Sequence, residues 1–230
     1  MTSVVKKMVF TGVMAGWMVA MSIGIAHATY YTNTFQVSVW NGNTTTKYAT
    51  LPTPSATPFA TFTYSGPIDF VNENGQSGTN TFGEFFGSHS GGISNFTSAD
   101  TFTQFLDTTM STPGETYNSY LAFNFNFNGT GTVSVTHDDG ASLYNANGSL
   151  FTSPGPTSAI TSTAFVPFIS GSGNVEPLTL VYVESNGAPA VLTMTATPEP
   201  STWLLFATGL AGLLFFGKKK MSFRNVENQI

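Results

Sequence analysis

The chain has 230 residues, of which 41% are apolar and only 8% are charged, and its formal net charge is −5. This length suits one domain with a sizeable core. So few charges cannot fill the charged flanking positions of a coiled coil, and an acidic chain lacks the basic surface that nucleic-acid binding requires. The absence of cysteine excludes disulfides, thiol catalysis and Cys-ligated zinc. The remaining composition, rich in Phe, Gly, Thr and Asn, is typical of secreted β-structure.

Residues 1–28 have the composition of a secretory signal peptide. Two lysines, Lys6 and Lys7, precede the apolar run Met8–Ile25. A small-x-small cleavage site follows, formed by Ala26 and Ala28 around a histidine. This order predicts a mature chain that begins near Thr29, and the alternative is an uncleaved membrane anchor.

The region between the two ends of the chain is strongly acidic. Residues 29–197 hold one basic residue, Lys47, against ten acidic ones, which gives a formal charge of −9. Most of these carboxylates have no cationic partner within the region, so they are either solvated or available to a cation such as Ca²⁺. Such a region repels an anionic polysaccharide unless a divalent ion bridges the two.

Apolar and polar residues alternate along several segments of this region. Residues 35–39 read Phe-Gln-Val-Ser-Val, and residues 123–127 read Phe-Asn-Phe-Asn-Phe. A period of two places the aromatic side chains on one face of an antiparallel sheet and the amides on the other. Gly, Pro and Asn separate the segments. The pattern predicts an all-β domain over residues 29–196, an antiparallel β-sandwich of jelly-roll type.

Two late strands are predicted at Leu178–Val183 and Ala190–Thr195. An Asn-Gly pair lies between them and favours a tight reversal, so the two strands are expected to form a hairpin. One internal helix is expected, around Ser98–Leu106. The phenylalanines of the segment 82–86 are expected in the core rather than on a binding surface.

The most chemically suggestive segment is His137-Asp138-Asp139-Gly140, and two interpretations of it are open. Adjacent carboxylates before a glycine can converge on one hard cation, which takes several oxygen ligands at about 2.3–2.6 Å. The same residues are also typical of an Asp-Gly turn, here between strands that end at Val135 and start at Leu143.

Two segments carry a family resemblance. The first, around residues 137–144, reads His-Asp-Asp-Gly-x-x-Leu-Tyr after a strand. The second, residues 180–192, reads Leu-x-Tyr-x-Glu-x-x-Gly-x-x-x-x-Leu. Together, over about residues 115–195, they resemble the protective-antigen-type β-sandwich of bacterial toxins, glycosidases and yeast flocculin adhesins. In the adhesin members, the paired aspartates hold a Ca²⁺ that chelates sugar hydroxyls.

The resemblance implies a set of Ca²⁺ ligands in this chain. Asp138 and Asp139 are the implied first ligands, and Glu184 and Asn186, in the matching later loop, are candidate oxygen donors. The chain departs from the adhesins in one respect, because no aromatic residue lies in Ser185–Ala190 to stack on a sugar. Many members of the family keep Asp-Asp-Gly only as a turn.

Patterns for catalysis are few. No nucleophile-elbow sequence accompanies His137, which we expect to be a strand-end histidine with satisfied hydrogen bonds. Glu84 and Glu115 do not define a glycosidase pair, because the distance between two carboxyls does not follow from sequence. We predict a non-catalytic protein, and the alternative is a secreted carbohydrate-active hydrolase that uses an acidic pair.

The C-terminal segment combines three features in a fixed order. Pro198, Glu199 and Pro200 precede the apolar run Trp203–Gly217, and the basic cluster of Lys218, Lys219 and Lys220 follows. As a helix this run spans ~22 Å of a ~30 Å hydrocarbon core, and snorkelling lysines make up part of the difference. The lysines place that end in the cytoplasm and the acidic region outside.

This order, PEPSTWLLFATGLAGLLFFGKKK, resembles the PEP-CTERM sorting signal of proteins handled by exosortase in Gram-negative bacteria that make exopolysaccharide. The cluster is Lys rather than the commoner Arg, and ten residues follow it. A plain C-terminal anchor is the alternative. The predicted organisation is a signal peptide (1–28), a β-domain (29–196), a sorting and anchor segment (197–220) and a cytoplasmic tail (221–230).

The expected function is that of an exported surface or extracellular-matrix protein. The resemblances imply exosortase as the processing partner, transient anchoring in the inner membrane by the C-terminal helix, and Ca²⁺ as a cofactor. Exopolysaccharide or another glycan is the expected ligand, and no nucleic acid is expected as a partner.

Overall fold

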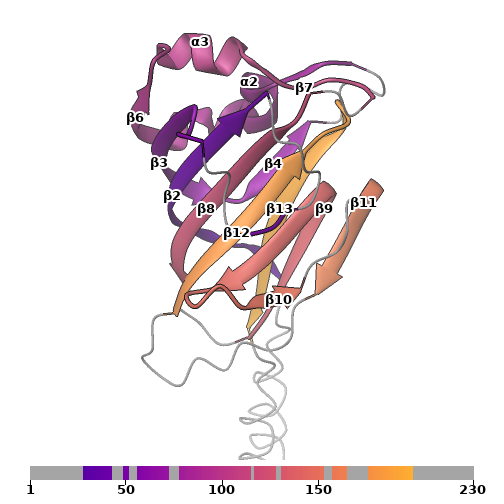
Figure 1. Ribbon diagram of the computed structural model, residues 1–230. Helices are drawn as coiled ribbons and strands as arrows, with labels where there is room; N and C mark the ends of the chain where they lie inside the picture. Colours follow the sequence, from indigo (N-terminus) through magenta and orange to yellow (C-terminus); the bar gives the residue numbers. More distant parts are fainter. Residues whose placement is uncertain are drawn as a thin grey trace, which may run out of the picture. The chain divides into compact units, whose positions relative to one another are not determined.

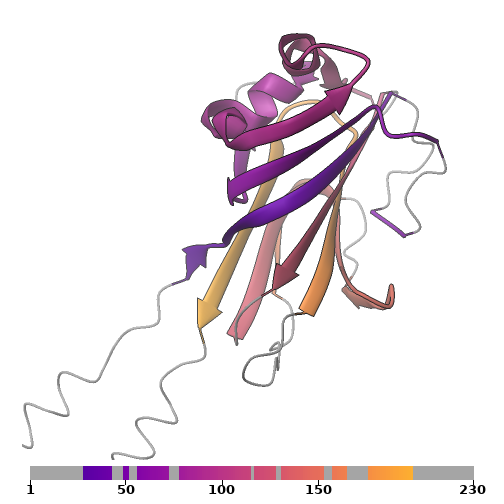
Figure 2. The same ribbon diagram turned by 90° about the vertical axis from the view of Figure 1, so that its left-hand side faces the viewer.

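The computed structural model describes residues 28–42, 49–51, 56–72, 78–114, 117–127, 131–152, 157–164 and 176–198 (Figures 1 and 2). The predicted signal helix up to His27 lies outside these residues, as do Lys47, Glu115 and the predicted anchor and tail from Glu199 onward. Within the described residues, no helix is both long and apolar enough to cross a membrane. Residues Ala28–Pro198 group as one unit by their contacts.

Thirteen strands and three short helical segments make up the described part of the chain. The strands are β1 (Thr29–Tyr30), β2 (Thr32–Asn41), β3 (Ala60–Pro67), β4 (Asp69–Asn72), β5 (Asn80–Thr81), β6 (Ile93–Ser98), β7 (Thr109–Ser111), β8 (Ser119–Phe127), β9 (Gly131–Asn145), β10 (Leu150–Thr152), β11 (Thr157–Ala164), β12 (Glu176–Glu184) and β13 (Ala190–Pro198). The helical segments are α2 (Phe82–Phe86), the 3-10 segment η1 (Gly87–Gly92) and α3 (Phe102–Asp107). The all-β class is therefore confirmed.

Eleven of the strands form one antiparallel sheet that curls around its core (Figures 1 and 2). The order along the sheet is β1-β13-β9-β12-β8-β2-β3-β6, with β4 added beside β13 and both β10 and β11 beside β9. The long strand β9 belongs to both halves of the curl, because its first part pairs with β13 and its second part pairs with β12. The predicted sandwich therefore takes the form of a single curled sheet with its two halves joined through β9.

The alternation predicted for residues 123–127 is present in β8. The three phenylalanines of this segment are buried, whereas Asn124 and Asn126 are exposed. The same alternation runs along the neighbouring strand β2, where Phe35 and Val37 are buried and Gln36 is exposed. Since both strands bury the same face, their amides share the opposite, solvent-facing side of the sheet.

The two late strands form where they were predicted, but their expected pairing is wrong. Strand β12 pairs with β8 and with the second part of β9, whereas β13 pairs with β4, β1 and the first part of β9. The loop 185–189 between them therefore passes from one half of the curl to the other. The Asn-Gly signal predicted a local reversal correctly, but the tertiary structure decides which strands it connects.

The expected helix is confirmed as α3. The Thr101 hydroxyl accepts a hydrogen bond from the Gln104 backbone N–H, and the Gln104 side chain accepts one from the Thr101 backbone N–H, so the two residues form a capping box. Sequence analysis missed the helix α2, which begins with the same device at Thr81 and Glu84. The signal Thr-x-x-Glu was present in the sequence at this position.

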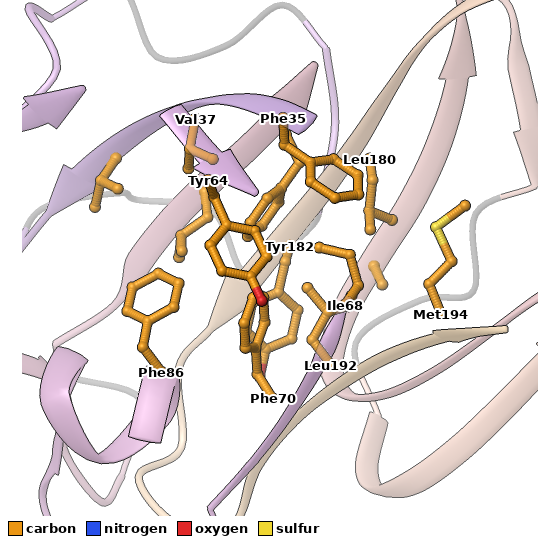
Figure 3. Close-up of a cluster of buried hydrophobic side chains, with 14 of the residues drawn as sticks. Phe35, Val37, Tyr64, Ile68, Phe70, Phe86, Leu180, Tyr182, Leu192 and Met194 are labelled. Atoms are coloured by element: carbon orange, nitrogen blue, oxygen red, sulfur yellow. The ribbon is translucent and has the colours of Figure 1, made fainter. Parts of the chain in front are cut away.

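The buried core lies between the two halves of the curl (Figure 3). Phe70 of β4 has no exposed surface, and its ring centroid lies 5.2 Å from that of Tyr64 on β3 and 5.1 Å from those of Phe85 and Phe86 on α2. All three phenylalanines of α2 are buried, which confirms their predicted place in the core. The helix α2 therefore closes part of the core that the sheet leaves open.

Candidate functional site

The Asp138-Asp139 pair lies where β9 passes from one half of the curled sheet to the other. His137 pairs with Leu192 of β13, and Gly140, three residues later, pairs with Val183 of β12. Asp139 has φ 55°, a left-handed conformation that aspartate adopts more readily than most residues. The chain reverses direction here, as the turn interpretation expects, because the two parts of β9 are antiparallel to β13 and β12, which themselves run in opposite directions (Figure 1). We call Asp138 and Asp139 the corner carboxylates.

The Asp139 carboxylate binds the start of the loop 185–189. Its Oδ2 atom accepts hydrogen bonds from the backbone N–H groups of Ser185 at 2.6 Å and Asn186 at 3.1 Å. The Asn186 side-chain Nδ2 lies 3.5 Å from Asp139 Oδ1. The structure thus brings together three of the four predicted metal ligands, namely the corner carboxylates and Asn186.

The Asp138 side chain is held by its own backbone. Its Oδ1 atom accepts a hydrogen bond of 2.9 Å from the Asp139 backbone N–H. Its Oδ2 atom accepts none from the residues that the structure describes. Although the residue as a whole is only 4% exposed, this oxygen is therefore available as an acceptor at the corner.

Glu184, the fourth predicted ligand, makes its hydrogen bonds elsewhere. It is fully buried, and its carboxyl oxygens accept bonds from the Ser111 hydroxyl at 3.0 Å and from the Tyr182 hydroxyl. Burial, together with the nearby charge of Asp139, raises its pKa well above the usual value. Both oxygens of Glu184 therefore already accept hydrogen bonds from the protein. Glu184 could coordinate a cation only if these bonds were broken.

The charge balance of the corner is unfavourable without a cation. Burial raises the pKa of Asp139 to about 6 and also raises the pKa of Asp138. Neither lysine nor arginine occurs among the described residues. Burial of these carboxylates disfavours their charged forms, and no lysine or arginine of the described residues offsets this cost.

His137 is fixed by the same corner. Its Nδ1 atom lies 3.0 Å from the Asp139 carbonyl oxygen, so this nitrogen is the one that carries the proton. Burial lowers the pKa of the imidazole, which stays neutral at physiological pH. The other ring nitrogen, Nε2, is buried and has no hydrogen-bond partner among the described residues, so the expectation of a histidine with all its hydrogen bonds satisfied is wrong. Through Nδ1 the ring bonds to a carbonyl rather than to a carboxylate.

Ca²⁺ fits the corner carboxylates in part. Two adjacent carboxylates, one of them with an oxygen that accepts no hydrogen bond from the described residues, suit a hard cation, and rotation of the Asn186 amide would offer its oxygen in place of its NH₂ group. Among the residues that the structure describes, no group of three or more acidic or histidine side chains is arranged to hold a metal. Further ligands would therefore come from backbone carbonyls, water or a bound molecule.

Sequence analysis missed two residues of the corner network, Ser111 and Tyr182. Tyr182 lies two residues before Glu184 in the Leu-x-Tyr-x-Glu segment. Because side chains alternate between the faces of a strand, the sequence could have predicted that both lie on the same face. Ser111 lies on β7, 73 residues before Glu184 in the chain, and no local pattern marks it. Only tertiary structure brings it to Glu184.

Comparison with known proteins identifies the C-terminal segment and places the β-domain among solved folds. Residues 196–220 match the PEP-CTERM protein-sorting motif. No sequence among the curated proteins matches the chain. The resemblance that the sequence indicated for the C-terminus is thus confirmed.

Three solved structures resemble the described domain. A PA14 sugar-binding domain from an RTX adhesin has 14% identity and a TM-score of 0.44, and the match covers 71% of this chain and 88% of that one. The PA14 domain of the antifreeze protein MpAFP has 14% identity and a TM-score of 0.45, over 75% and 88% of the two chains. A GH31 α-xylosidase from Xanthomonas citri has 6% identity and a TM-score of 0.37, over 70% of this chain but 13% of the enzyme.

Proposed function

We propose that this chain is a non-catalytic surface or extracellular-matrix protein whose β-domain binds Ca²⁺ at the corner carboxylates and, through the ion, the hydroxyls of a carbohydrate. The PEP-CTERM motif indicates an exported protein that is processed at the membrane. We further propose exosortase as the processing partner, a transient anchor in the inner membrane through residues 203–217, and release to the surface of a Gram-negative cell.

The observation that supports a calcium site is the burial of two adjacent carboxylates at the corner. Asp138 and Asp139 are 4% and 2% exposed, and the described residues supply no lysine or arginine to balance them. When bound, Ca²⁺ would supply this charge and leave coordination positions for neutral oxygen ligands such as sugar hydroxyls. Asp138 and Asp139 would hold the ion, while the backbone of Ser185 and Asn186 keeps Asp139 oriented.

The non-catalytic assignment is supported by how the acidic side chains are used. Asp139 accepts two backbone N–H bonds, Glu184 accepts two hydroxyl bonds, and Glu84 caps the helix α2. A glycosidase needs two carboxyl groups that face the bond to be cleaved, one of them free to donate a proton. The carboxyl groups of Asp139, Glu184 and Glu84 have structural partners instead.

Calcium titration tests the proposed site. Thermal unfolding of the full-length chain in detergent is expected to shift upward by roughly 5–10 °C between EDTA and Ca²⁺ at about a hundred times the dissociation constant, because the ion binds only the folded state. Asp138→Asn is expected to abolish most of this shift. Asp107→Asn, at an exposed aspartate at the end of α3, is the matched control and is expected to keep it. An unfolding temperature that Ca²⁺ does not change would contradict the proposal.

Export is tested separately in a bacterium that carries an exosortase. Proteinase K added to intact spheroplasts is expected to digest the β-domain, because the positive cluster at residues 218–220 retains only its own end in the cytoplasm. A cytoplasmic marker enzyme must survive the same treatment. Recovery of the intact chain from the cytoplasm would contradict the proposed route.

A further inference from the structure

A polar groove runs over the outer face of β2, β8 and β12, away from the corner carboxylates. It has a volume of about 1230 Å³. Its polar side chains come from Asn33, Gln36, Asn124, Asn126, Asn147 and Thr179, among others. Thr179 lies five residues before Glu184 on β12, so these two residues are roughly 17 Å apart along the strand. We call this feature the amide groove.

The strand register explains why amides gather there. Gln36 of β2 lies opposite Asn124 of β8, and Asn124 lies opposite Thr179 of β12, so the three side chains form one row across the sheet. Asn126 lies two residues further along β8, on the same face. The alternation that buries the phenylalanines of β8 therefore also builds the wall of the groove.

Several amide oxygens in the groove already accept hydrogen bonds from the protein. Asn124 Oδ1 accepts from the Thr179 hydroxyl at 2.8 Å. The Oδ1 atoms of Asn145 and Asn147 both accept from the Ser149 backbone N–H at 2.8 Å. These bonds orient the NH₂ groups of the same side chains. Asn124 Nδ2 already donates to the Gln36 carbonyl at 3.5 Å and keeps one N–H for a ligand, whereas the NH₂ groups of Asn145 and Asn147 donate to no described residue.

Asn126 differs from the other amides of the groove because its side chain makes no hydrogen bond within the described part of the protein. It is exposed, whereas its backbone carbonyl accepts a hydrogen bond of 2.8 Å from Asn33 Nδ2. A substitution of its amide group therefore leaves the strand contacts in place. Asn126 is the residue at which a ligand of the groove is best tested.

The charge of the groove restricts its ligand. None of its lining residues is ionisable, and apolar residues, Leu51 and Pro177 among them, lie between the amides. An anionic polymer would meet no lysine or arginine among the described residues, in a region with a formal charge of −9. A cationic one would meet no carboxylate in the groove. An uncharged chain that is rich in hydroxyl and ether oxygens, with apolar C–H faces, fits both kinds of lining.

We infer that the amide groove binds an uncharged polysaccharide chain without a metal ion. Amide NH₂ groups donate hydrogen bonds to hydroxyl and ether oxygens, and the apolar side chains contact the C–H faces of the sugar rings. The groove is separate from the corner carboxylates, so this inference does not depend on the calcium site. Binding there is expected to be unaffected by EDTA.

Isothermal titration of the full-length chain in detergent, with EDTA present, tests the inference. The probes are neutral hexasaccharides of the β-1,4-glucan, α-1,4-glucan, β-1,4-mannan and β-1,4-galactan types, with an alginate hexasaccharide as the anionic comparison. At least one neutral probe is expected to bind, and alginate is expected not to. Asn126→Asp, which keeps the shape but replaces a donor by a charged acceptor, is expected to weaken binding about tenfold.

Asn95→Asp is the matched control. Asn95 is exposed on β6, outside the groove, and aspartate tolerates its φ of 52° as asparagine does. The same change of charge there is expected to leave the affinity unchanged. The inference is overturned if no neutral probe binds in EDTA, if both variants weaken binding equally, or if binding needs Ca²⁺ and is lost in Asp138→Asn.

Discussion

Replacing Phe70 with alanine is expected to lower the free energy of unfolding by about 3–5 kcal/mol. The ring is fully buried, and its centroid lies 5.2 Å from that of Tyr64 and 6.1 Å from that of Phe123. Phe70 belongs to β4, which is added beside β13, whereas its two ring partners belong to β3 and β8. The substitution therefore leaves a cavity between the two halves of the curled sheet, which the rigid strands cannot close.

Val71→Ala is the control for this experiment. Val71 follows Phe70 on the same strand but is 45% exposed, so its truncation is expected to cost well under about 1 kcal/mol. Urea unfolding of both variants, followed by circular dichroism, measures the difference. If the two substitutions cost the same, Phe70 does not join the two halves as described.

The free energy of unfolding of the wild-type chain in EDTA is expected to decrease as the pH rises from about 4 to 7.5. Relative to the variant Asp139→Asn, the decrease is on the order of 3 kcal/mol. The cause is the pKa of Asp139, which burial raises to about 6 from an ordinary value of 3.8. The folded state holds this proton more tightly than the unfolded state. The stabilisation is thus complete below about pH 4 and is lost as the pH rises through 6.

Other groups of the corner also titrate, and comparing the two chains isolates Asp139. The raised pKa values of Asp138 and Glu184 give a pH dependence of the same sign. The lowered pKa of His137 acts in the opposite direction, because stability from a neutral buried imidazole is lost as the pH falls below 6.5. These groups are present in both chains, so the part of their effect that comes from burial cancels in the difference. The part of the raised Glu184 pKa that comes from the charge of Asp139 is lost in Asp139→Asn and adds to the measured difference with the same sign. The amide introduced by Asp139→Asn retains an oxygen that can accept from the backbone of the loop 185–189.

The measurement is urea unfolding of both chains at several pH values with EDTA present. Parallel curves for the two chains would show that burial does not raise the pKa of Asp139. Repeating the series with Ca²⁺ links this result to the proposed function. The ion is expected to restore the stability of the wild-type chain at neutral pH and to have little effect on Asp139→Asn.

The sequence predicted those features that are set by local pattern. The period of two in residues 123–127 placed the phenylalanines in the core and the amides outside, because successive strand residues point to opposite faces. The helix α3 was also predictable, as was the sorting motif at residues 196–220, since each is encoded in a contiguous segment. The helix α2 was readable from its capping box and was missed.

The pairing of the strands was decided only by the tertiary structure. Asn186 and Gly187 marked a reversal, but the strands on either side of it pair with different parts of β9. The corner at Asp138-Asp139 arises for the same reason, because a single strand can serve both halves of the curl only if it bends between them. Partners such as Ser111 and Glu184 then meet from distant positions in the chain.

The low charge of the chain is apparent from its composition. In the structure it corresponds to a groove lined by neutral amides and to a corner with two buried carboxylates. The sequence alone determined the acidic central region, the alternating strands and the C-terminal motif, because these depend on residue type and spacing. Only the tertiary structure gathered the neutral amides of three strands into one groove and buried two carboxylates at one corner. Register and burial depend on contacts between residues far apart in the chain, which local sequence does not specify.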